Sequence, residues 1–278
     1  MPIQKSLPLL CGLLLVAAAA QAVTLKDRFE QTVPLKPGSE VRLGNVNGGV
    51  TFEAWNRNEV HIVAEKQVRA GSDDQARKLM SQIKIDVVPG PSGLRIDTRM
   101  PKHEGGVLSG LFGGEVSMSV SYKVQVPRQV ALGITNSNGG LAVTGTQGNA
   151  QLETSNGALS IHGVAGDMTL KTSNGHISVA GSEGTVKAET SNGGIDAELT
   201  RYSGHELSFE TSNGAVSIRL PRDARFTVDA ETSNGGVKSD FPVAGGKPDK
   251  HSLKGTVNGG GPTLHIRTSN GGVHIREV

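Results

Sequence analysis

The tripeptide Ser-Asn-Gly recurs from Ser137 to Gly271 at nearly constant spacing. The first three intervals between its asparagines are 18 residues and the next two are 21. A fixed period of this length indicates a solenoid, because one short unit cannot bury its apolar face without stacking on its neighbours. Counting Val257-Asn258-Gly259 as a variant, the asparagines are Asn138, Asn156, Asn174, Asn192, Asn213, Asn234, Asn258 and Asn270.

Apolar residues also recur at matched places in each repeat. Leu159 and Ile161 follow one corner, and Met168 and Leu170 come later in the same coil. Alternation with polar residues predicts two short half-buried strands in each coil. The prediction is an all-β fold, a parallel β-helix-like solenoid with coils of about 18–21 residues, over residues 136–278.

Asn-Gly suits the corner of such a coil, because glycine tolerates a positive φ and asparagine is the next most tolerant residue. Stacked corners would let the asparagine amides bond from coil to coil. We therefore interpret the eight asparagines as a structural corner ladder. The functional alternative is a polar strip of serine hydroxyls and amides that binds carbohydrate.

Residues 23–135 form a different, β-rich region with short alternating runs. One helix is predicted near residues 72–83, since Ser72 is a good N-cap and Asp73 and Asp74 favour the positive end of a helix. The stretch Asn45–Val50 already resembles a corner of the repeat. We expect it to be an early coil of the same stack.

Residues 1–22 have the pattern of a secretory signal peptide. Lys5 precedes an apolar run from Leu7 to Ala20, and Ala20-Gln21-Ala22 is a small-residue cleavage site. The run is too short to span a bilayer, so no transmembrane segment is expected in the mature chain. We predict an exported protein, periplasmic or associated with the cell surface.

Composition excludes several classes of function. Removal of Lys5 lowers the formal net charge from +2 to +1, which favours no nucleic-acid partner. The one cysteine, Cys11, lies in the predicted leader, so the mature chain has no disulfide or thiol chemistry. Aromatic residues make up 3% of the chain, so a narrow core of aliphatic side chains is expected.

Charged residues precede the Thr-Ser-Asn-Gly corners. In a stack of consecutive coils Glu189, Glu210 and Glu231 would form one column of like charges. Such a column would either bind a divalent cation or splay its side chains into water, and we favour the second. The histidines are scattered and no metal-binding motif occurs, so no metal or cofactor is expected.

No motif of a catalytic site is present, and we predict that the chain is not an enzyme. The strongest enzyme alternative is a polysaccharide lyase or glycosidase on a β-helix, with carboxylates from Asp196, Glu198 or Asp240. His265 and His274 could face one another across adjacent coils, but we favour chance placement on a polar face. The repeats contain no tryptophan, which argues against aromatic platforms for a sugar.

The chain resembles a bacterial putative-adhesin family of β-strand-repeat domains of unknown function. Three features carry the resemblance over about residues 30–278: the Ala54–Val60 hairpin, the Val124–Pro127 strand end and the serial Ser-Asn-Gly corners. The resemblance implies a right-handed β-helix-like stack at the cell envelope with an adhesin-like role. It supplies no catalytic residues.

These observations predict an exported scaffold or binding module whose partner is a cell-envelope polysaccharide or protein. A structural envelope-stress protein without a ligand remains an alternative. Two segments depart from the regular strand pattern. They are a glycine-rich loop at 101–115 and an excursion at 240–254, which we expect to project from the stack. The last coil, Thr268–Val278, has no evident cap, and we expect weak self-association through it.

Overall fold

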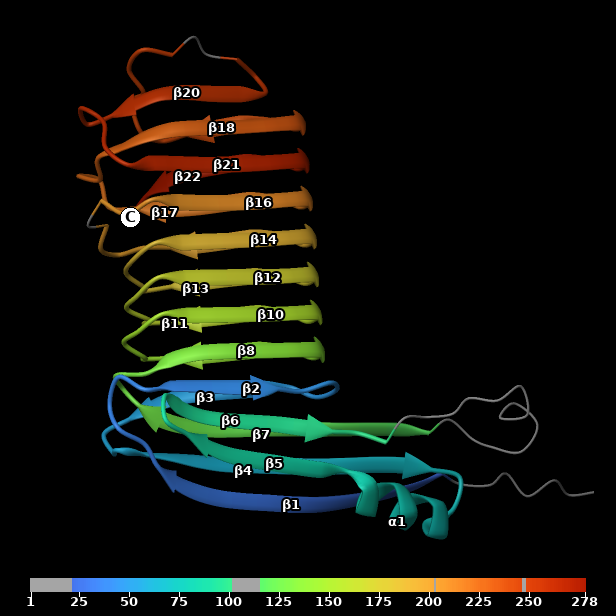
Figure 1. Cartoon of the computed structure of the whole chain (residues 1–278). Helices are drawn as coiled ribbons and strands as arrows, with labels where there is room; N and C mark the ends of the chain where they lie inside the picture. The colour runs from blue at the N-terminus through green and yellow to red at the C-terminus, as the bar shows by residue number, and fades with distance from the viewer. Residues whose placement is uncertain (1–21, 102–115, 203, 247–248) are drawn as a thin grey trace, which may run out of the picture.

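The chain forms a stack of β-coils that bury their apolar side chains between two long sheets (Figure 1). The computed structural model describes residues 22–101, 116–202, 204–246 and 249–278. Within these ranges each sheet has 11 strands and there is one helix. This confirms the predicted all-β solenoid, and its handedness stays a prediction.

Sheet A runs along one side of the stack. Its strands, in spatial order, are β1 (Val23–Pro34), β4 (Glu59–Ala70), β7 (Ser117–Pro127), β3 (Val50–Trp55), β9 (Leu141–Thr144), β11 (Leu159–His162), β13 (Ile177–Ala180), β15 (Ile195–Glu198), β17 (Val216–Leu220), β22 (Val273–Glu277) and β19 (Val237–Ser239).

Sheet B forms the other side. Its strands, in spatial order, are β20 (Ser252–Val257), β18 (Phe226–Asn234), β21 (Thr263–Asn270), β16 (Leu207–Asn213), β14 (Val186–Asn192), β12 (Met168–Asn174), β10 (Ala150–Asn156), β8 (Ala131–Asn138), β2 (Glu40–Gly44), β6 (Gly93–Arg99) and β5 (Lys84–Gly90).

Each coil contributes one strand to each sheet. In the second Ser-Asn-Gly coil β10 enters sheet B, the corner turns the chain, and β11 enters sheet A. Parallel pairing stacks equivalent residues, with Leu152 beside Leu170 and Leu159 beside Ile177. All four side chains are fully buried, so each apolar column continues from coil to coil. Burial of an aliphatic side chain contributes about 1.5–3 kcal/mol, which accumulates only when coils stack.

The N-terminal region belongs to the same stack. β2 pairs in parallel with β8, and β3 pairs in parallel with β9, so they form the predicted early coil. Below it β1, β4 and β7 pair antiparallel and close the end. The same two sheets run through residues 23–135 and 136–278. The predicted division at residue 135 stays a prediction.

The single helix, α1 (Asp73–Gln82), packs on β4 and β1. Ser72 caps it as predicted, because its Oγ accepts a hydrogen bond from the backbone nitrogen of Gln75 at 3.3 Å. Ala76 is the residue that the helix buries completely. The helix therefore covers the N-terminal end of the stack (Figure 1).

The C-terminal coil lies inside the stack rather than at its end. β21 is hydrogen-bonded to β16 on one side and to β18 on the other (Figure 1). β22 lies between β17 and β19. The expectation of an open edge at Thr268–Val278 is therefore wrong. The outermost strands at this end are β20 and β19, which come earlier in the sequence.

The described parts of the excursion at 240–254 form a cap, which corrects the expectation that they project from the stack. β20 pairs antiparallel with β18. Ala244 then exchanges two 2.9 Å backbone hydrogen bonds with Thr256 on the outer side of β20. Phe241 is buried and meets Phe226 edge-on, with ring centroids 5.5 Å apart. Covering a strand edge in this way limits pairing with other chains.

Two predicted features lie outside the described residues. They are the signal peptide, apart from Ala22, and the glycine-rich loop at 101–115, apart from Pro101.

Candidate functional site: an open groove along sheet B

Asparagine side chains form one hydrogen-bonded column at the corners of sheet B. Asn156 donates from Nδ2 to Oδ1 of Asn138 at 2.8 Å, and Asn174 donates to Asn156 at 2.9 Å. The column begins at Asn47, which accepts from Asn138 at 2.7 Å. It continues through the predicted Asn192, Asn213, Asn270 and Asn234, in that spatial order and at 2.8–2.9 Å.

Asn258 does not belong to this column, which corrects its predicted place in the ladder. It lies in the connection between β20 and β21 and has a positive φ of 51°. Its Nδ2 donates to the backbone oxygens of Arg222 and Ala224 at 3.0 and 2.9 Å. The Asn-Gly pair here makes a tight connection between strands rather than a coil corner.

A second column, of threonines, was missed by the sequence reasoning. Thr172 is buried and its Oγ1 donates to the backbone oxygen of Gly157 in the preceding coil at 3.0 Å. Thr190 makes the same bond to Gly175 at 3.1 Å. The signal was present, because threonine stands two residues before asparagine in six of the corners. These bonds satisfy corner carbonyls inside the stack.

Most of the corner glycines are needed for space rather than for a positive φ, and Gly139 of the first corner is the exception, with a φ of 135°. A Cβ on Gly175 would overlap the carbonyl oxygen of Gly157, and one on Gly193 would overlap that of Gly175. Neither glycine has a left-handed φ, which corrects the reason predicted for this position. Left-handed glycines occur instead at the opposite turn, at Gly163 and Gly181, both with φ of 61°.

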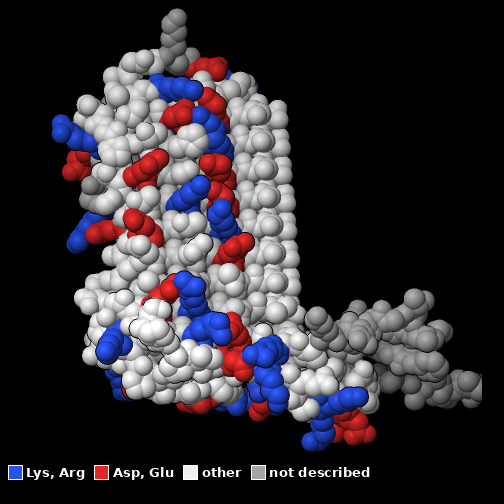
Figure 2. Space-filling view, in the orientation of Figure 1, with Lys and Arg blue, Asp and Glu red and all other residues white. Residues whose placement is uncertain are grey.

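An open groove of about 820 Å³ follows these corners along sheet B. Its lining comes from the Thr-Ser pairs of six coils and from the charged residue before each pair, with His251 and Ser252 from the cap. The serines, such as Ser191 and Ser212, are exposed. Figure 2 shows charged side chains in columns on this face, beside an uncharged strip at the strand ends.

The charged column of the groove alternates in sign more than it would if the coils stacked in the order of the sequence. From β10 to β18 it contains Glu153, Lys171, Glu189, Glu210, Arg267 and Glu231. The inserted strand β21 places Arg267 between Glu210 and Glu231. The predicted column of three glutamates is therefore interrupted, and the repulsion between those two charges is relieved.

Lys187 on the same strand and Lys171 on the neighbouring strand hold the side chain of Glu189 at the middle of the groove. Glu189 lies 3.0 Å from Lys187 and 3.1 Å from Lys171. Partial burial opposes ionisation of Glu189, but the hydrogen bonds and charges of the two lysines lower its pKa. The carboxylate therefore stays ionised at neutral pH.

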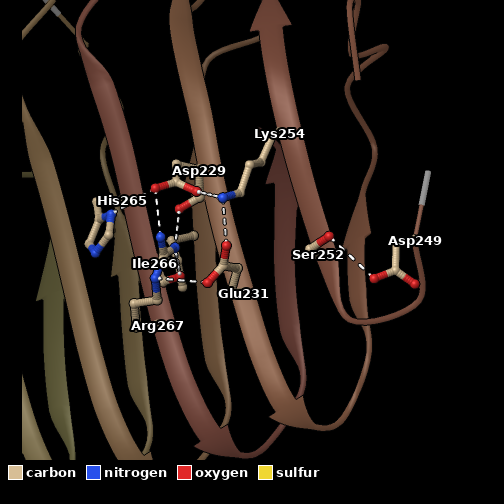
Figure 3. Close-up of polar contacts among 8 residues, drawn as sticks. All are labelled: Asp229, Glu231, Asp249, Ser252, Lys254, His265, Ile266 and Arg267. Atoms are coloured by element: carbon tan, nitrogen blue, oxygen red, sulfur yellow. Dashed lines mark hydrogen bonds and ion pairs between the residues drawn. The ribbon is translucent and has the colours of Figure 1, made fainter. Parts of the chain in front are cut away.

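A denser network of ion pairs lies at the C-terminal end of the groove and includes two of its lining residues, Glu231 and Arg267 (Figure 3). Arg267 donates to Asp229 at 2.6 Å, and Lys254 lies 2.6 Å from Glu231. Partial burial opposes ionisation of Asp229, but Arg267 and then Lys254 lower its pKa. The hydrogen bond with Lys254 is the main cause of the lowered pKa of Glu231.

The carboxylates considered for an enzyme lie on other parts of the stack and are each beside a base. Asp196 is 3.2 Å from His176, Glu198 is 3.4 Å from Arg219, and Asp240 is 3.7 Å from His274. Asp196 and Glu198 are on β15, whereas Asp240 follows β19, three strands away in sheet A. They do not come together as a pair flanking one bond.

His265 and His274 are on different sheets, so they do not face one another. His265 on β21 points to Asp229 at 3.3 Å, in the network of Figure 3. His274 on β22 accepts a hydrogen bond at Nδ1 from Arg276. In the described ranges, three or more His, Cys, Asp or Glu side chains nowhere gather as a metal site would require.

The family described as Toastrack DUF4097 matches residues 108–276. The comparison with curated proteins gives no match.

Similar solved structures include a putative cell adhesion protein from Clostridium sporogenes, at 14% identity and a TM-score of 0.35, covering 91% of this chain and 100% of that one. A putative adhesin from Bacteroides fragilis has 11% identity and a TM-score of 0.41, covering 91% and 97%. A putative lipid binding protein from Parabacteroides distasonis has 9% identity and a TM-score of 0.27, covering 90% and 96%.

Proposed function

The chain belongs to the Toastrack DUF4097 family, and we propose that it is an exported, non-enzymatic, adhesin-like binding module of the cell envelope. The observation that carries the proposal is the groove along sheet B. It is long, open and lined by repeated polar side chains rather than by one compact cluster. A surface of this shape suits an extended ligand that meets several coils at once.

The ligand that fits best is a cell-envelope polysaccharide. Serine hydroxyls and charged groups recur along the groove at the spacing of adjacent strands, about 4.8 Å. Such an array can donate and accept hydrogen bonds at regular intervals, as the hydroxyls of a polymer require. The lining residues include no phenylalanine, tyrosine or tryptophan, so recognition depends on polar contacts.

A binding role is supported over an enzymatic one by how the acidic groups are held. Glu189 and Asp229 are ionised and engaged with bases, and their pKa values are lowered. A general acid needs the opposite, a carboxyl whose pKa is raised toward neutrality. We therefore assign the groove to binding.

Export is supported by the sequence of the first 22 residues. In the described part of the chain, no helix has the length and apolar character that crossing a bilayer requires. The proposal places the mature chain in the periplasm or at the cell surface.

The test is a binding screen with glycans and envelope extracts. It compares the parent mature chain with a variant whose groove is blocked and with a control variant. Ser191→Arg with Ser212→Arg places two bulky cations on exposed groove positions. The matched control, Ser160→Arg with Ser178→Arg, carries the same change on paired positions of sheet A.

Binding of a polysaccharide that the groove variant loses and the control retains is the expected result. Equal loss in both variants, or no polysaccharide bound by the parent chain, would contradict the proposal. Capture of a protein through the same groove would contradict a polysaccharide ligand and would indicate a protein ligand instead. Turnover of a bound glycan would favour the β-helix enzyme instead.

A further inference from the structure

The C-terminal coil fills a slot between two coils that precede it in the sequence. β21 and β22 lie between the coil of β16 and β17 and the coil of β18 and β19. Figure 1 shows this order, with β21 between β18 and β16. Both walls of the slot are therefore complete before the last residues of the chain are reached.

The coil is held on both sides by hydrogen bonds that depend on the identity of its side chains. Asn270 donates to Asn213 at 2.8 Å on one wall and accepts from Asn234 at 2.9 Å on the other. Thr268 donates to the backbone oxygen of Gly214 at 3.0 Å. Arg267 reaches Asp229 at 2.6 Å. These contacts set one register for the incoming strand.

The same coil also completes the core. Leu264, Ile266 and Ile275 are fully buried, and Val273 is nearly so. Without them, the apolar columns of both sheets would be interrupted at the slot. A vacant slot therefore attracts any segment with this alternation and this corner.

The connection to the coil is short and rich in glycine. Residues 258–262 read Asn-Gly-Gly-Gly-Pro and cross the start of β18. Asn258, Gly259 and Gly260 have positive φ values of 51°, 89° and 82°. Glycines that change φ freely let such a connection open into an extended hinge. Exchange of an identical terminal element across a hinge is a low-cost route to a dimer.

We propose that residues 263–278 of one copy of this chain insert into the slot of a second copy, between β16–β17 and β18–β19. Every contact of the coil with the walls of its slot is retained in the exchanged dimer. The net change is confined to the hinge. This gives the predicted self-association a different route, since the coil is exchanged rather than paired at an open edge.

Disulfide trapping between two single-cysteine variants tests the exchange. Ser212 and Ser269 are exposed and lie on adjacent strands, flanked by the register pairs of Thr211 with Thr268 and Asn213 with Asn270. Neighbouring strands are about 4.8 Å apart, which is within the Cα separation that a disulfide allows. The predicted mature chain has no cysteine of its own.

Chains with Ser212→Cys are mixed with chains with Ser269→Cys, opened briefly in mild denaturant, returned to buffer and oxidised with oxidised glutathione. The control mixture is Ser155→Cys with Ser173→Cys, which are exposed on the adjacent strands β10 and β12 in the interior of the stack. Mass spectrometry counts only the mixed disulfide between the two variants.

The mixed 212–269 disulfide is expected at least about tenfold more often than the mixed 155–173 disulfide. Paired coils hold two thiols at an effective concentration of about millimolar, far above that of a dilute chain. Equal yields in the two mixtures, or no 212–269 disulfide after refolding, would overturn the proposal. Trapping of a different segment opposite residue 212 would also overturn it.

Discussion

Asn174 donates a hydrogen bond from Nδ2 to Oδ1 of Asn156 in the coil below, at 2.9 Å. Asn192 in turn donates to Asn174 at the same distance. Each interior asparagine of the column therefore acts once as donor and once as acceptor. The corner is a structural device whose repetition leaves the serines beside it free to face the groove.

Removing one asparagine should break two bonds of the column. We expect Asn174→Ala to lower the free energy of unfolding by about 1–3 kcal/mol, since each bond contributes about 0.5–1.5 kcal/mol. Urea unfolding followed by circular dichroism measures the change. Ser173→Ala, at the exposed neighbour, should stay within about 0.5 kcal/mol of the parent chain. Equal effects of the two substitutions would show that the column does not stabilise the stack.

A methyl group on a corner glycine should force adjacent coils apart. Gly175→Ala places its Cβ against the carbonyl oxygen of Gly157, and we expect a loss of about 3 kcal/mol or more. Gly272→Ala is the control, because its Cβ would come no nearer than 3.6 Å to a neighbour and alanine already occupies the equivalent place at Ala158. Thermal unfolding of both variants makes the comparison, and tolerance of Gly175→Ala would refute the close approach of the corners.

The network around Asp229 should make the stack sensitive to acid. Arg267 and Lys254 lower the folded-state pKa of Asp229 against partial burial, so its stabilisation is present above the unfolded pKa and is lost as the pH falls through the folded pKa. The loss therefore falls at and below about pH 4. Arg267→Gln should destabilise the chain more at pH 7 than at pH 3. Arg69→Gln, an exposed arginine on β4, should show no such difference.

Urea unfolding curves of the parent chain and of each variant, recorded at pH 7 and at pH 3, measure the differences in the free energy of unfolding. A constant gap between Arg267→Gln and the parent chain would mean that Arg267 acts through packing rather than through the charge of Asp229.

Phe241 should hold the cap over the end of sheet B. Its buried ring packs edge-on against Phe226 at an interplanar angle of 84°. Truncation of a buried phenylalanine costs about 3–5 kcal/mol, and here we expect the cost as local opening of β18 and β20. Hydrogen exchange of Phe241→Ala should accelerate in those two strands and remain unchanged in β10 and β12. Uniform acceleration along the stack would show that the cap is not a separate unit.

The regular part of the fold could be predicted because the repeat fixes it. Once Asn156 and Asn174 are 18 residues apart, the alternation of Leu159, Ile161, Met168 and Leu170 determines which side chains face inward. Ser72 and the two aspartates after it were enough to place the helix.

The order of the last coils could not be predicted, because every coil has the same alternation and corner. Nothing in Thr268–Val278 differs locally from a coil that follows β18 in space. The difference arises after the excursion, because β20 returns antiparallel to β18 and occupies the outer position first. Asn258 was misplaced for the same reason, since its Asn-Gly pair looks like a corner until β20 is seen to run the other way.

The groove was foreseen only as a strip of serine hydroxyls. Its charge pattern depends on Arg267 lying between Glu210 and Glu231, and these residues are far apart in the sequence. The threonine column was visible in the repeat, but its buried hydrogen bonds require the depth of the corner, which a sequence does not display.

The groove and the exchangeable coil both depend on one placement, that of β21 between β16 and β18. Two double variants of the full mature chain test it directly, Ser212→Cys with Ser269→Cys and Ser212→Cys with Ser233→Cys. Mass spectrometry of the oxidised monomers measures the intramolecular disulfide. The first pair should close within one chain, because β16 and β21 are adjacent, and the second should remain as thiols. Closure of the 212–233 pair with the 212–269 pair left open would mean that the coils stack in sequence order, and would contradict the account.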